Sequence, residues 1–259
     1  MTPDDDPLPL TQPVMRDPFA RLRAATPARI GLGQTGDGLL TAPMLDFQLA
    51  HARARDAVHA RADFGTLAQA LAPREIIEVE SAAGDRVTYL QRPDLGRRLS
   101  EESRPNLRHG PYDVALVIGD GLSARAVDAQ AVDVVEAILA RLSPRLSLAP
   151  IVLARQARVA LGDEIGDALG ARLVAMLIGE RPGLSVADSL GIYLTFDPKP
   201  GRRDSERNCI SNIHGNGGLT AAAAAEKLVW LIEEALRLQL TGIELKDDQD
   251  TTVLIGGGS

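Results

Sequence analysis

The stretch Val114-Ala-Leu-Val-Ile-Gly-Asp-Gly-Leu-Ser-Ala124 decides the fold class of this 259-residue chain. Its first five residues are an apolar run rich in β-branched side chains, which is typical of a strand buried in a parallel sheet. Gly119-Asp-Gly121 follows as a turn, and Val127, Val134 and Ile138 then recur at helical spacing. The order of strand, turn and helix predicts one unit of an α/β domain.

The same order continues downstream of this unit. Further strands are predicted from the apolar runs at residues 151–153, 173–178 and 192–196. Residues 162–169 form a predicted helix, and Thr220 is placed to cap the final helix. We therefore predict a Rossmann-like domain with a parallel sheet, in which residues 197–218 form a long loop.

The sequence before residue 110 has a different pattern. Residues 64–71 have helical spacing, whereas residues 75–80 and 87–91 are predicted to pair as a hairpin around Gly84-Asp85. These features divide the chain into two predicted domains.

The first predicted domain, residues 1–62, consists of a tail and a small helical docking domain. Its acidic, proline-rich start, residues 1–14, is predicted to be disordered. Leu45 and Leu49 belong to the apolar face of a predicted helix. The second predicted domain, residues 63–259, carries the α/β fold.

Composition excludes several classes of protein. Acidic residues outnumber basic ones by 35 to 28, and aromatic residues make up only 3%, so the chain lacks both the positive field and the stacking surfaces of nucleic-acid binders. A single cysteine cannot form an internal disulfide. The sequence contains neither an apolar run of about 20 residues, as a membrane span needs, nor the features of a signal peptide. We expect the chain to be cytosolic or packaged inside something assembled in the cytosol.

Three loops are candidates for a ligand site, because ligands of α/β sheets bind beyond the carboxyl ends of the strands. They are residues 119–123, 179–183 and 197–218, all rich in glycine and polar side chains. The first loop lacks the third glycine of the dinucleotide fingerprint. Residues 119–123 are more simply interpreted as a tight turn, and residues 179–183 as a loop with a surface ion pair.

The third loop contains Cys209 and His214. A nucleophilic Cys209 would need His214 or His109 as its base, so a buried or ligand-contacting thiol is the simpler interpretation. A cysteine and a histidine five residues apart, with no further ligands, do not make a zinc site. No catalytic constellation is predicted from these residues.

Five motifs extend this interpretation across most of the chain. They are Ala28-Arg-Ile-Gly-Leu-Gly33, Phe47-Gln-Leu-Ala-His-Ala-Arg-Ala-Arg-Asp-Ala-Val-His59, Arg92-Pro-Asp-Leu-Gly-Arg97, Gly179-Glu-Arg-Pro-Gly-Leu184 and Cys209-Ile-Ser-Asn-Ile-His214. In this order they resemble the small (light) subunit of ethanolamine ammonia-lyase, from about Asp17 to Asp247. The resemblance implies a subunit of an adenosylcobalamin-dependent enzyme that converts ethanolamine to acetaldehyde and ammonia.

The resemblance also implies a partner and a division of labour. A large subunit with a TIM barrel would bind ethanolamine, and cobalamin would lie between that barrel and the α/β domain of this chain. The chain would then contribute half of a cofactor site, no catalytic residue and no metal ligand of its own. A hetero-oligomer in the cytoplasm or in a bacterial microcompartment is the expected setting.

Three residues match cofactor contacts of the family. They are Val159, Glu180 and Cys209, and they offer an apolar contact, an acceptor for amide N–H groups and a small polarizable side chain. Asn212-Ile-His-Gly-Asn-Gly217 is close to the Asp-x-His-x-x-Gly motif whose histidine ligates cobalt. Asn212 cannot orient and activate the imidazole as an aspartate would, so we predict that His214 does not bind cobalt.

Two other functions remain open at this stage. One is a self-sufficient, nucleotide-binding Rossmann-like enzyme, and the other is a purely structural or targeting subunit. The three functions differ in whether the chain retains cobalamin and whether it is active alone.

Overall fold

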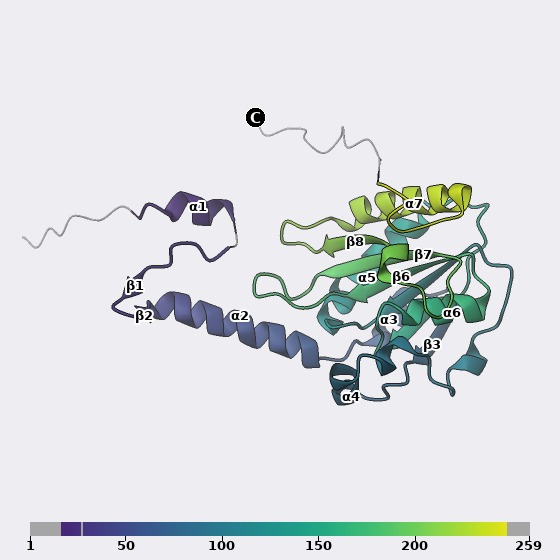
Figure 1. Cartoon of the computed structure of the whole chain (residues 1–259), viewed down its shortest axis with the longest axis horizontal. Coiled ribbons are helices and arrows are strands. Elements are labelled where there is room, and N and C mark those ends of the chain that lie inside the picture. The colour runs from purple at the N-terminus through teal and green to yellow at the C-terminus, as the bar shows by residue number, and fades with distance from the viewer. Residues whose placement is uncertain (1–16, 27, 248–259) are drawn as a thin grey trace, which may run out of the picture. The chain divides into compact units, whose positions relative to one another are not determined.

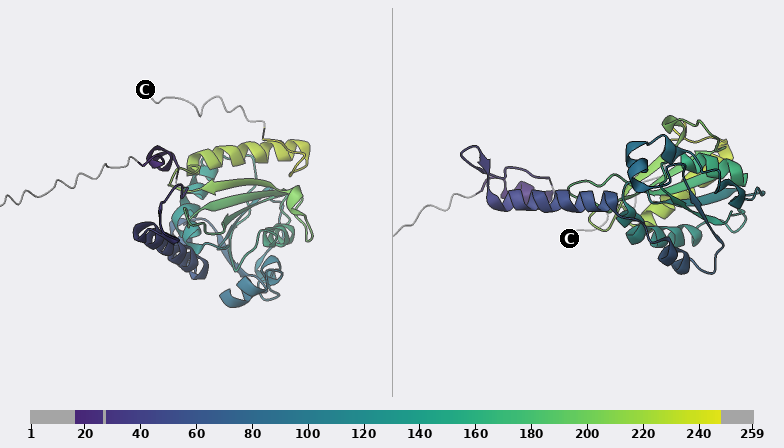
Figure 2. Two further views of the ribbon diagram at one scale, coloured as in Figure 1. Left: turned by 60° about the vertical axis from the view of Figure 1, so that its left-hand side comes forward. Right: turned by 90° about the horizontal axis from the view of Figure 1, so that it is seen from below.

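The computed structural model describes residues 17–26 and 28–247. They form two compact units, which divide within helix α2 (Thr41–His59), the first unit ending at Leu49. Figure 1 labels the helices and strands, and Figure 2 adds two further views. The segment predicted to be disordered, residues 1–14, lies outside the described residues.

The first unit contains little regular structure before α2. Helix α1 (Ala20–Ala25) buries none of its side chains. Strands β1 (Gln34–Thr35) and β2 (Gly38–Leu39) pair antiparallel, and Gly36 between them has a φ of +59°, which glycine adopts without a steric penalty. On α2, Leu45 and Leu49 are 57% and 50% exposed, so their predicted apolar face lies on the surface.

The second unit is built on a six-stranded sheet with the order β3-β5-β4-β6-β7-β8. The strands are β3 (Ile76–Glu80), β4 (Val114–Gly119), β5 (Ile151–Arg155), β6 (Leu173–Gly179), β7 (Leu190–Phe196) and β8 (Asn208–Ile213). The first four strands in the order are parallel, whereas β7 and β8 continue the sheet in antiparallel pairs. Every residue of β4 and β6 is buried. The α/β class is confirmed, with a mixed sheet.

Helices cover the two faces of this sheet. On one face, α3 (Phe64–Ala70), α5 (Ala124–Leu139) and α7 (Ala221–Leu238) form a continuous apolar core with the sheet. On the other face, α6 (Leu161–Leu169) packs against a second core. Alternate residues of β4, β5 and β6 therefore enter different cores, as the pleat of a sheet requires.

The predicted hairpin at residues 75–80 and 87–91 is wrong. Its first arm is β3, which pairs in parallel with β5, and its second arm belongs to helix α4 (Arg86–Gln91). The Asp85 carboxylate accepts hydrogen bonds from the backbone N–H of Val87, at 2.8 Å, and of the following residue, at 3.0 Å. This N-cap starts a helix despite the β-branched residues that follow.

Two further expectations about strands need correction. The run at residues 192–196 is part of β7, which is antiparallel to β6, because a ten-residue connection is too short for the crossover between parallel strands. The predicted loop at 197–218 contains β8, an edge strand. Its Ile210 and Ile213 are buried while Cys209 is exposed, so few apolar residues marked it as a strand. In the described part of the chain, no helix is long and apolar enough to cross a membrane.

Candidate functional site

The three loops predicted from the sequence meet at the carboxyl edge of the sheet. The backbone N–H of Leu122, after β4, donates to the Gly179 carbonyl at the end of β6, with an N···O distance of 2.9 Å. The N–H of Asn212, near the end of β8, approaches Glu180 Oε2 at 3.3 Å. Segments that lie far apart in the sequence therefore form one surface.

Two glycines allow this close contact between loops. Gly121 has a φ of +60°, and a Cβ on Gly179 would lie 2.0 Å from the Ser123 carbonyl oxygen. Ser123 caps α5 through the Ala126 N–H, and its hydroxyl donates to the Ala187 carbonyl at 2.7 Å. The loop after β4 thus also anchors the connection between β6 and β7.

Glu180 is held so that one carboxylate oxygen stays open. Its Oε2 accepts the Ser189 hydroxyl at 2.5 Å and the Asn212 N–H. Its Oε1 lies close over Gly191. A Cβ added to this glycine would be only 2.9 Å from that oxygen, so a larger residue would displace the carboxylate. No donor of the described chain bonds Oε1, so this half-buried carboxylate presents a free acceptor beside β7.

Beside Glu180, the sheet face that carries α6 becomes uncovered. Met176, Tyr193 and Cys209 are neighbours in register across β6, β7 and β8. A Cβ on Gly162 would touch Met176, so α6 covers the first residue of this row, whereas Tyr193 is half-buried and Cys209 is exposed. We call Tyr193 and Cys209 the open shelf; Gly191, two residues before Tyr193, is buried next to Glu180.

Electrostatics keep the groups of the shelf protonated. Partial burial, together with the charge of Glu180, raises the pKa of the Cys209 thiol, and the nearby Tyr193 hydroxyl opposes this shift. Burial also raises the pKa of the Tyr193 hydroxyl, and the neighbouring Cys209 adds to the rise. The shelf therefore presents a neutral thiol and a neutral phenol at neutral pH.

Val159 lies on the loop between β5 and α6. It is half-buried against the same apolar core as Tyr193. The loop is fixed by Asp120, whose two carboxylate oxygens accept the N–H groups of Gln156 and Ala157, each at 3.0 Å. Burial raises the pKa of Asp120. The structure places Glu180 near enough to Cys209 for its charge to act on the thiol, and it places Val159 on a loop at the same edge of the sheet.

A stack of side chains that the sequence did not reveal supports this loop. The guanidinium carbons of Arg86 and Arg158 lie 4.8 Å and 4.2 Å from the centre of the Tyr89 ring. The Tyr89 hydroxyl donates to the Ala157 carbonyl at 3.0 Å, and burial raises its pKa to about 12. Arg86 and Tyr89 were missed because their segment was interpreted as a strand; the Asp85 N-cap was the available signal.

His214 is a fixed part of the third loop. Its Nδ1 accepts the N–H of Asn216 at 3.1 Å, so its Nε2 carries the proton and donates to Asn212 Oδ1 at 2.7 Å. The ring is 5% exposed. Both ring nitrogens are therefore used within the loop. Among the described residues, no three His, Cys, Asp or Glu side chains form a group that could hold a metal ion.

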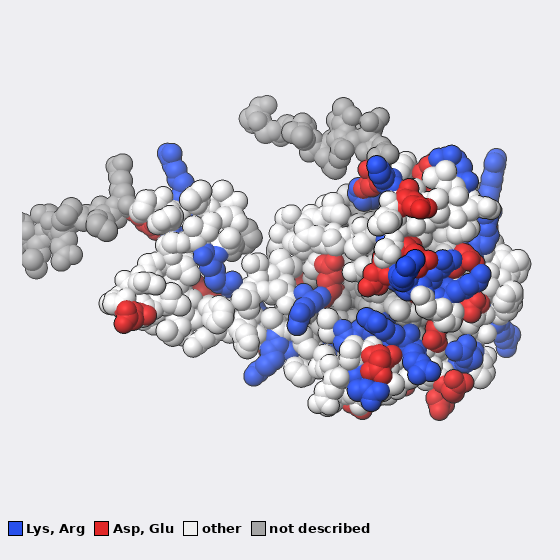
Figure 3. All heavy atoms as spheres, viewed as in Figure 1, with Lys and Arg blue, Asp and Glu red and all other residues white. Residues whose placement is uncertain are grey.

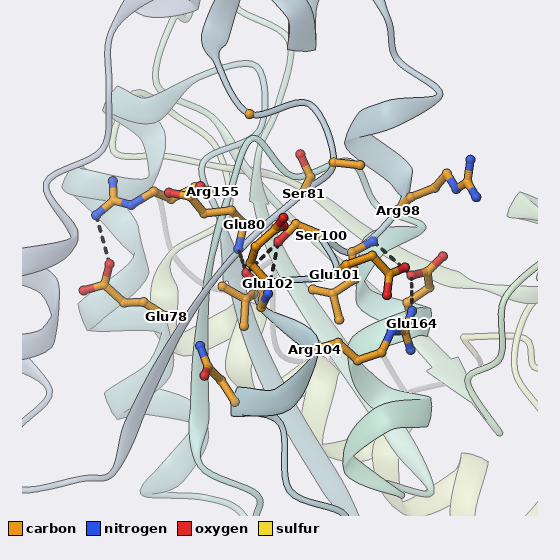
Figure 4. A pocket seen from close by; sticks show the side chains of 16 residues that line it. Glu78, Glu80, Ser81, Arg98, Ser100, Glu101, Glu102, Arg104, Arg155 and Glu164 are labelled. Carbon is orange, nitrogen blue, oxygen red and sulfur yellow. Dashed lines mark hydrogen bonds and ion pairs between the residues drawn. The ribbon is translucent and has the colours of Figure 1, made fainter.

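The structure also contains a charged cavity of about 720 Å³ beside the edge strand β3 (Figure 4). Opposite charges pair across its walls, Arg155 with Glu78 at 3.0 Å and Arg104 with Glu164 at 3.3 Å. None of Val159, Glu180 and Cys209 lines it. Glu80, Glu101 and Glu102 also line it, with Arg98 as the remaining basic residue, so the cavity keeps an excess of acidic side chains.

Comparison with known proteins extends over nearly the whole chain. The family model described as ethanolamine ammonia-lyase light chain matches residues 16–246. The chain belongs to the ethanolamine ammonia-lyase light chain family. Relatives named ethanolamine ammonia-lyase small subunit include one from Xanthomonas campestris pv. campestris, 52% identical over 95% of this chain and 93% of the relative. Another, from Azotobacter vinelandii, is 50% identical over 95% of this chain and 94% of the relative.

A third relative of the same name, from Rhodopseudomonas palustris, is 55% identical over 88% of this chain and 89% of its own length. Membership of the light-chain family therefore covers both units and includes all three loops at the carboxyl edge of the sheet. The resemblance inferred from the five motifs is confirmed.

Proposed function

We propose that this chain is the small subunit of an adenosylcobalamin-dependent ethanolamine ammonia-lyase, acting in the cytoplasm or in a bacterial microcompartment. It would form half of the cobalamin site, and the large subunit would bind ethanolamine and carry the catalytic residues. Family membership supports the subunit identity. When bound, adenosylcobalamin would supply the radical chemistry that converts ethanolamine to acetaldehyde and ammonia.

The observation that carries the cofactor assignment is the open acceptor of Glu180 over Gly191. Cobalamin has a broad, largely apolar ring system surrounded by amide side chains, so it needs both a flat surface and acceptors for N–H groups. The open shelf provides a surface without a covering helix, and Glu180 Oε1 provides the acceptor. Val159 and Cys209 would add an apolar and a polarizable contact.

The position of the proposed cofactor site also suggests a role for each of the two predicted domains. We propose that residues 63–259 are a Rossmann-like cobalamin-binding domain, because the three candidate loops follow β4, β6 and β7 and include β8, and they meet at the carboxyl edge of the sheet, where ligands of α/β folds bind. Residues 1–62 would dock on the large subunit through exposed apolar side chains such as Leu45 and Leu49.

One experiment separates the candidate functions. The chain is expressed alone and together with the large subunit, and cobalamin retention and ethanolamine deamination are measured for each. We expect activity and tight retention only when both chains are present. Deamination by this chain alone would overturn the proposal in favour of a self-sufficient enzyme. A large subunit that is fully active alone would favour a structural role.

Glu180→Gln tests the acceptor. The change removes the charge and one acceptor oxygen, so the affinity of the assembled apoenzyme for cyanocobalamin should fall at least about tenfold, as for a hydrogen bond to a charged group. Equilibrium dialysis measures it, and circular dichroism should show an unchanged fold. Glu78→Gln, in a surface ion pair, is the control. An unchanged dissociation constant for Glu180→Gln would count against this role of Glu180.

Both ring nitrogens of His214 are hydrogen-bonded within the loop, and this leads to a prediction about cobalt. We expect no protein nitrogen on cobalt, since a ligating Nε2 would have to break its bond to Asn212. Electron paramagnetic resonance of the Co(II) state, with the chain labelled with ¹⁵N, measures this. Coupling to a labelled nitrogen would contradict the prediction, and unlabelled protein is the control.

A further inference from the structure

Arg86, the first residue of α4, is a buried cation that contacts three segments of the second unit. The lysines and arginines visible in Figure 3 lie at the surface, many of them beside acidic side chains, whereas Arg86 is only 6% exposed. Its guanidinium donates from Nε to the Val58 carbonyl at 2.7 Å and from Nη1 to the Gly121 carbonyl at 2.8 Å. Its Nη1 also lies 3.8 Å from Asp120 Oδ2.

The first of these segments is the end of α2. Val58 is the last residue but one of this helix, so its carbonyl has no N–H partner within the helix. A cation at this end of a helix also interacts favourably with the helix dipole. Val58 and Arg86 belong to the same compact unit, which begins at residue 50. Arg86 therefore fixes where α2 ends within that unit.

The second segment is the turn after β4. The Gly121 carbonyl accepts a hydrogen bond from Arg86, and the next N–H, that of Leu122, donates to the Gly179 carbonyl. A single peptide group is therefore held on both sides. Because Gly179 directly precedes Glu180 in the chain, this contact also fixes the strand end that carries the Glu180 carboxylate.

The third segment is the loop between β5 and α6, which Arg86 reaches through Asp120. The Asp120 carboxylate is 5% exposed and accepts the N–H groups of Gln156 and Ala157, each at 3.0 Å. Burial raises the pKa of Asp120, and the charge of Arg86 opposes this rise. Arg86 thus helps to maintain a charged acceptor for the loop that carries Val159.

We propose that Arg86 is a positioning residue of the cofactor site, which sets the position of Glu180 relative to Val159. Arg86 acts on Glu180 through the Gly121 peptide group and on Val159 through Asp120. This inference rests on the proposed function, since Glu180 and Val159 are themselves proposed cofactor contacts.

The geometry of these contacts requires an arginine. The two carbonyl oxygens accept from different nitrogens of one planar group, whereas a lysine has all its donors on a single nitrogen. The Tyr89 ring supports the guanidinium from one face, 4.8 Å from its carbon. Nη2 of Arg86 is buried without a partner in the described chain, which costs stability. A cation kept at that cost fits a role in positioning better than a role in stability alone.

The first test measures the affinity of the assembled apoenzyme for cyanocobalamin by equilibrium dialysis. Arg86→Met removes both hydrogen bonds and the charge, so the affinity should fall about tenfold, as for hydrogen bonds from a charged donor. Arg86→Lys keeps a charge beside Asp120 and should lose less. Arg74→Met is the matched control, because Arg74 also bonds a carboxylate, that of Glu136 at 2.6 Å, but precedes β3 at the opposite edge of the sheet. Its affinity should not change.

A double-mutant cycle separates positioning from a general loss of stability. Because Arg86 acts partly through Glu180, Arg86→Met should lower the affinity less than about threefold once Glu180→Gln is present. Hydrogen exchange followed by mass spectrometry gives a second readout. Peptides that cover residues 119–123 and 154–160 should exchange faster in Arg86→Met, and peptides from α7 should not. Fully additive affinity losses, or an equal increase of exchange in α7, would overturn the inference.

The outcomes also distinguish this inference from the proposed function. If the wild-type assembly does not bind cyanocobalamin, the proposed function fails. If the wild type binds it and a folded Arg86→Met variant binds equally well, only the role of Arg86 fails. Should Arg86→Met fold poorly, Arg86→Lys is tested in its place. Wild-type affinity in that variant, with unchanged exchange at residues 119–123, would then overturn the inference.

Discussion

At the scale of single residues, the ion pair of Arg207 and Asp163 shows how the polar loop before β8 is held to α6. Both side chains are only 2% exposed. Burial raises the pKa of the Asp163 carboxyl, and the guanidinium of Arg207 opposes that shift. Arg207 also donates to Asp204 Oδ1 at 2.8 Å and to the Arg202 carbonyl at 2.9 Å. The pair fixes the start of the strand that carries Cys209.

Arg207→Met should be strongly destabilising. It leaves the Asp163 carboxylate buried without its cation, so the free energy of unfolding should fall by about 3–5 kcal/mol. Urea denaturation followed by circular dichroism measures it. Asp204→Asn is the matched control, because the Asp204 side chain is 93% exposed and its pairing should contribute less than about 1 kcal/mol. Equal losses in the two variants would contradict the prediction.

At the scale of elements, two helix caps of the same kind have different neighbours. Ser123 caps α5 and also bonds the Ala187 carbonyl in the connection that leads to Ser189 and Glu180. Thr220 caps α7 by accepting the Ala223 N–H at 3.2 Å. The Ser123 side chain therefore bonds the connection that carries Glu180, whereas the Thr220 side chain bonds its own helix.

Ser123→Ala and Thr220→Ala should each lower the free energy of unfolding by about 1 kcal/mol, because each removes an N-cap. Only Ser123→Ala should also weaken the binding of cyanocobalamin to the assembled apoenzyme, since it releases the connection that orients Glu180. Thermal melts and equilibrium dialysis measure the two effects. Equal weakening of binding in the two variants would show that the hydrogen bond from Ser123 to Ala187 does not contribute to cofactor binding.

Elements were predicted well where local sequence decides them. The buried strands β4 and β6 are continuous apolar runs, and α3 and α7 begin at recognisable positions. The segment at 87–91 was assigned wrongly because β-branched side chains favour a strand, while the Asp85 cap favours a helix. β8 was missed because an edge strand with one solvent face needs few apolar residues.

At the scale of the whole molecule, the two units differ in whether their large apolar side chains are buried or exposed. The second unit buries them in two cores on opposite faces of one sheet. The first unit exposes several large ones, including Leu45 and Leu49, which lie four residues apart on α2 and so share a face of the helix. Such a face is typical of a surface that binds another protein.

The double change Leu45→Gln and Leu49→Gln should weaken assembly with the large subunit at least about tenfold, because each buried leucine contributes about 1.5–3 kcal/mol. The melting temperature of the chain alone should not change. Analytical ultracentrifugation of the mixed subunits measures assembly. Val87→Gln, at a 61% exposed position in the second unit, is the control. Unchanged assembly would exclude this face of α2 as a docking surface.

The sequence by itself determined the α/β class, the three loops and the family, because apolar runs, glycine turns and spaced motifs are local signals that one chain carries in order. Through the resemblance to the family it also predicted Glu180 and Cys209 as cofactor contacts. Only the tertiary structure decided that Cys209 lies opposite Tyr193 in the sheet and that Gly191 leaves room for the open oxygen of Glu180. It also decided that Asp120 fixes the loop of Val159. These relations depend on strand order and register, which are set by long-range pairing and leave no local pattern in the sequence.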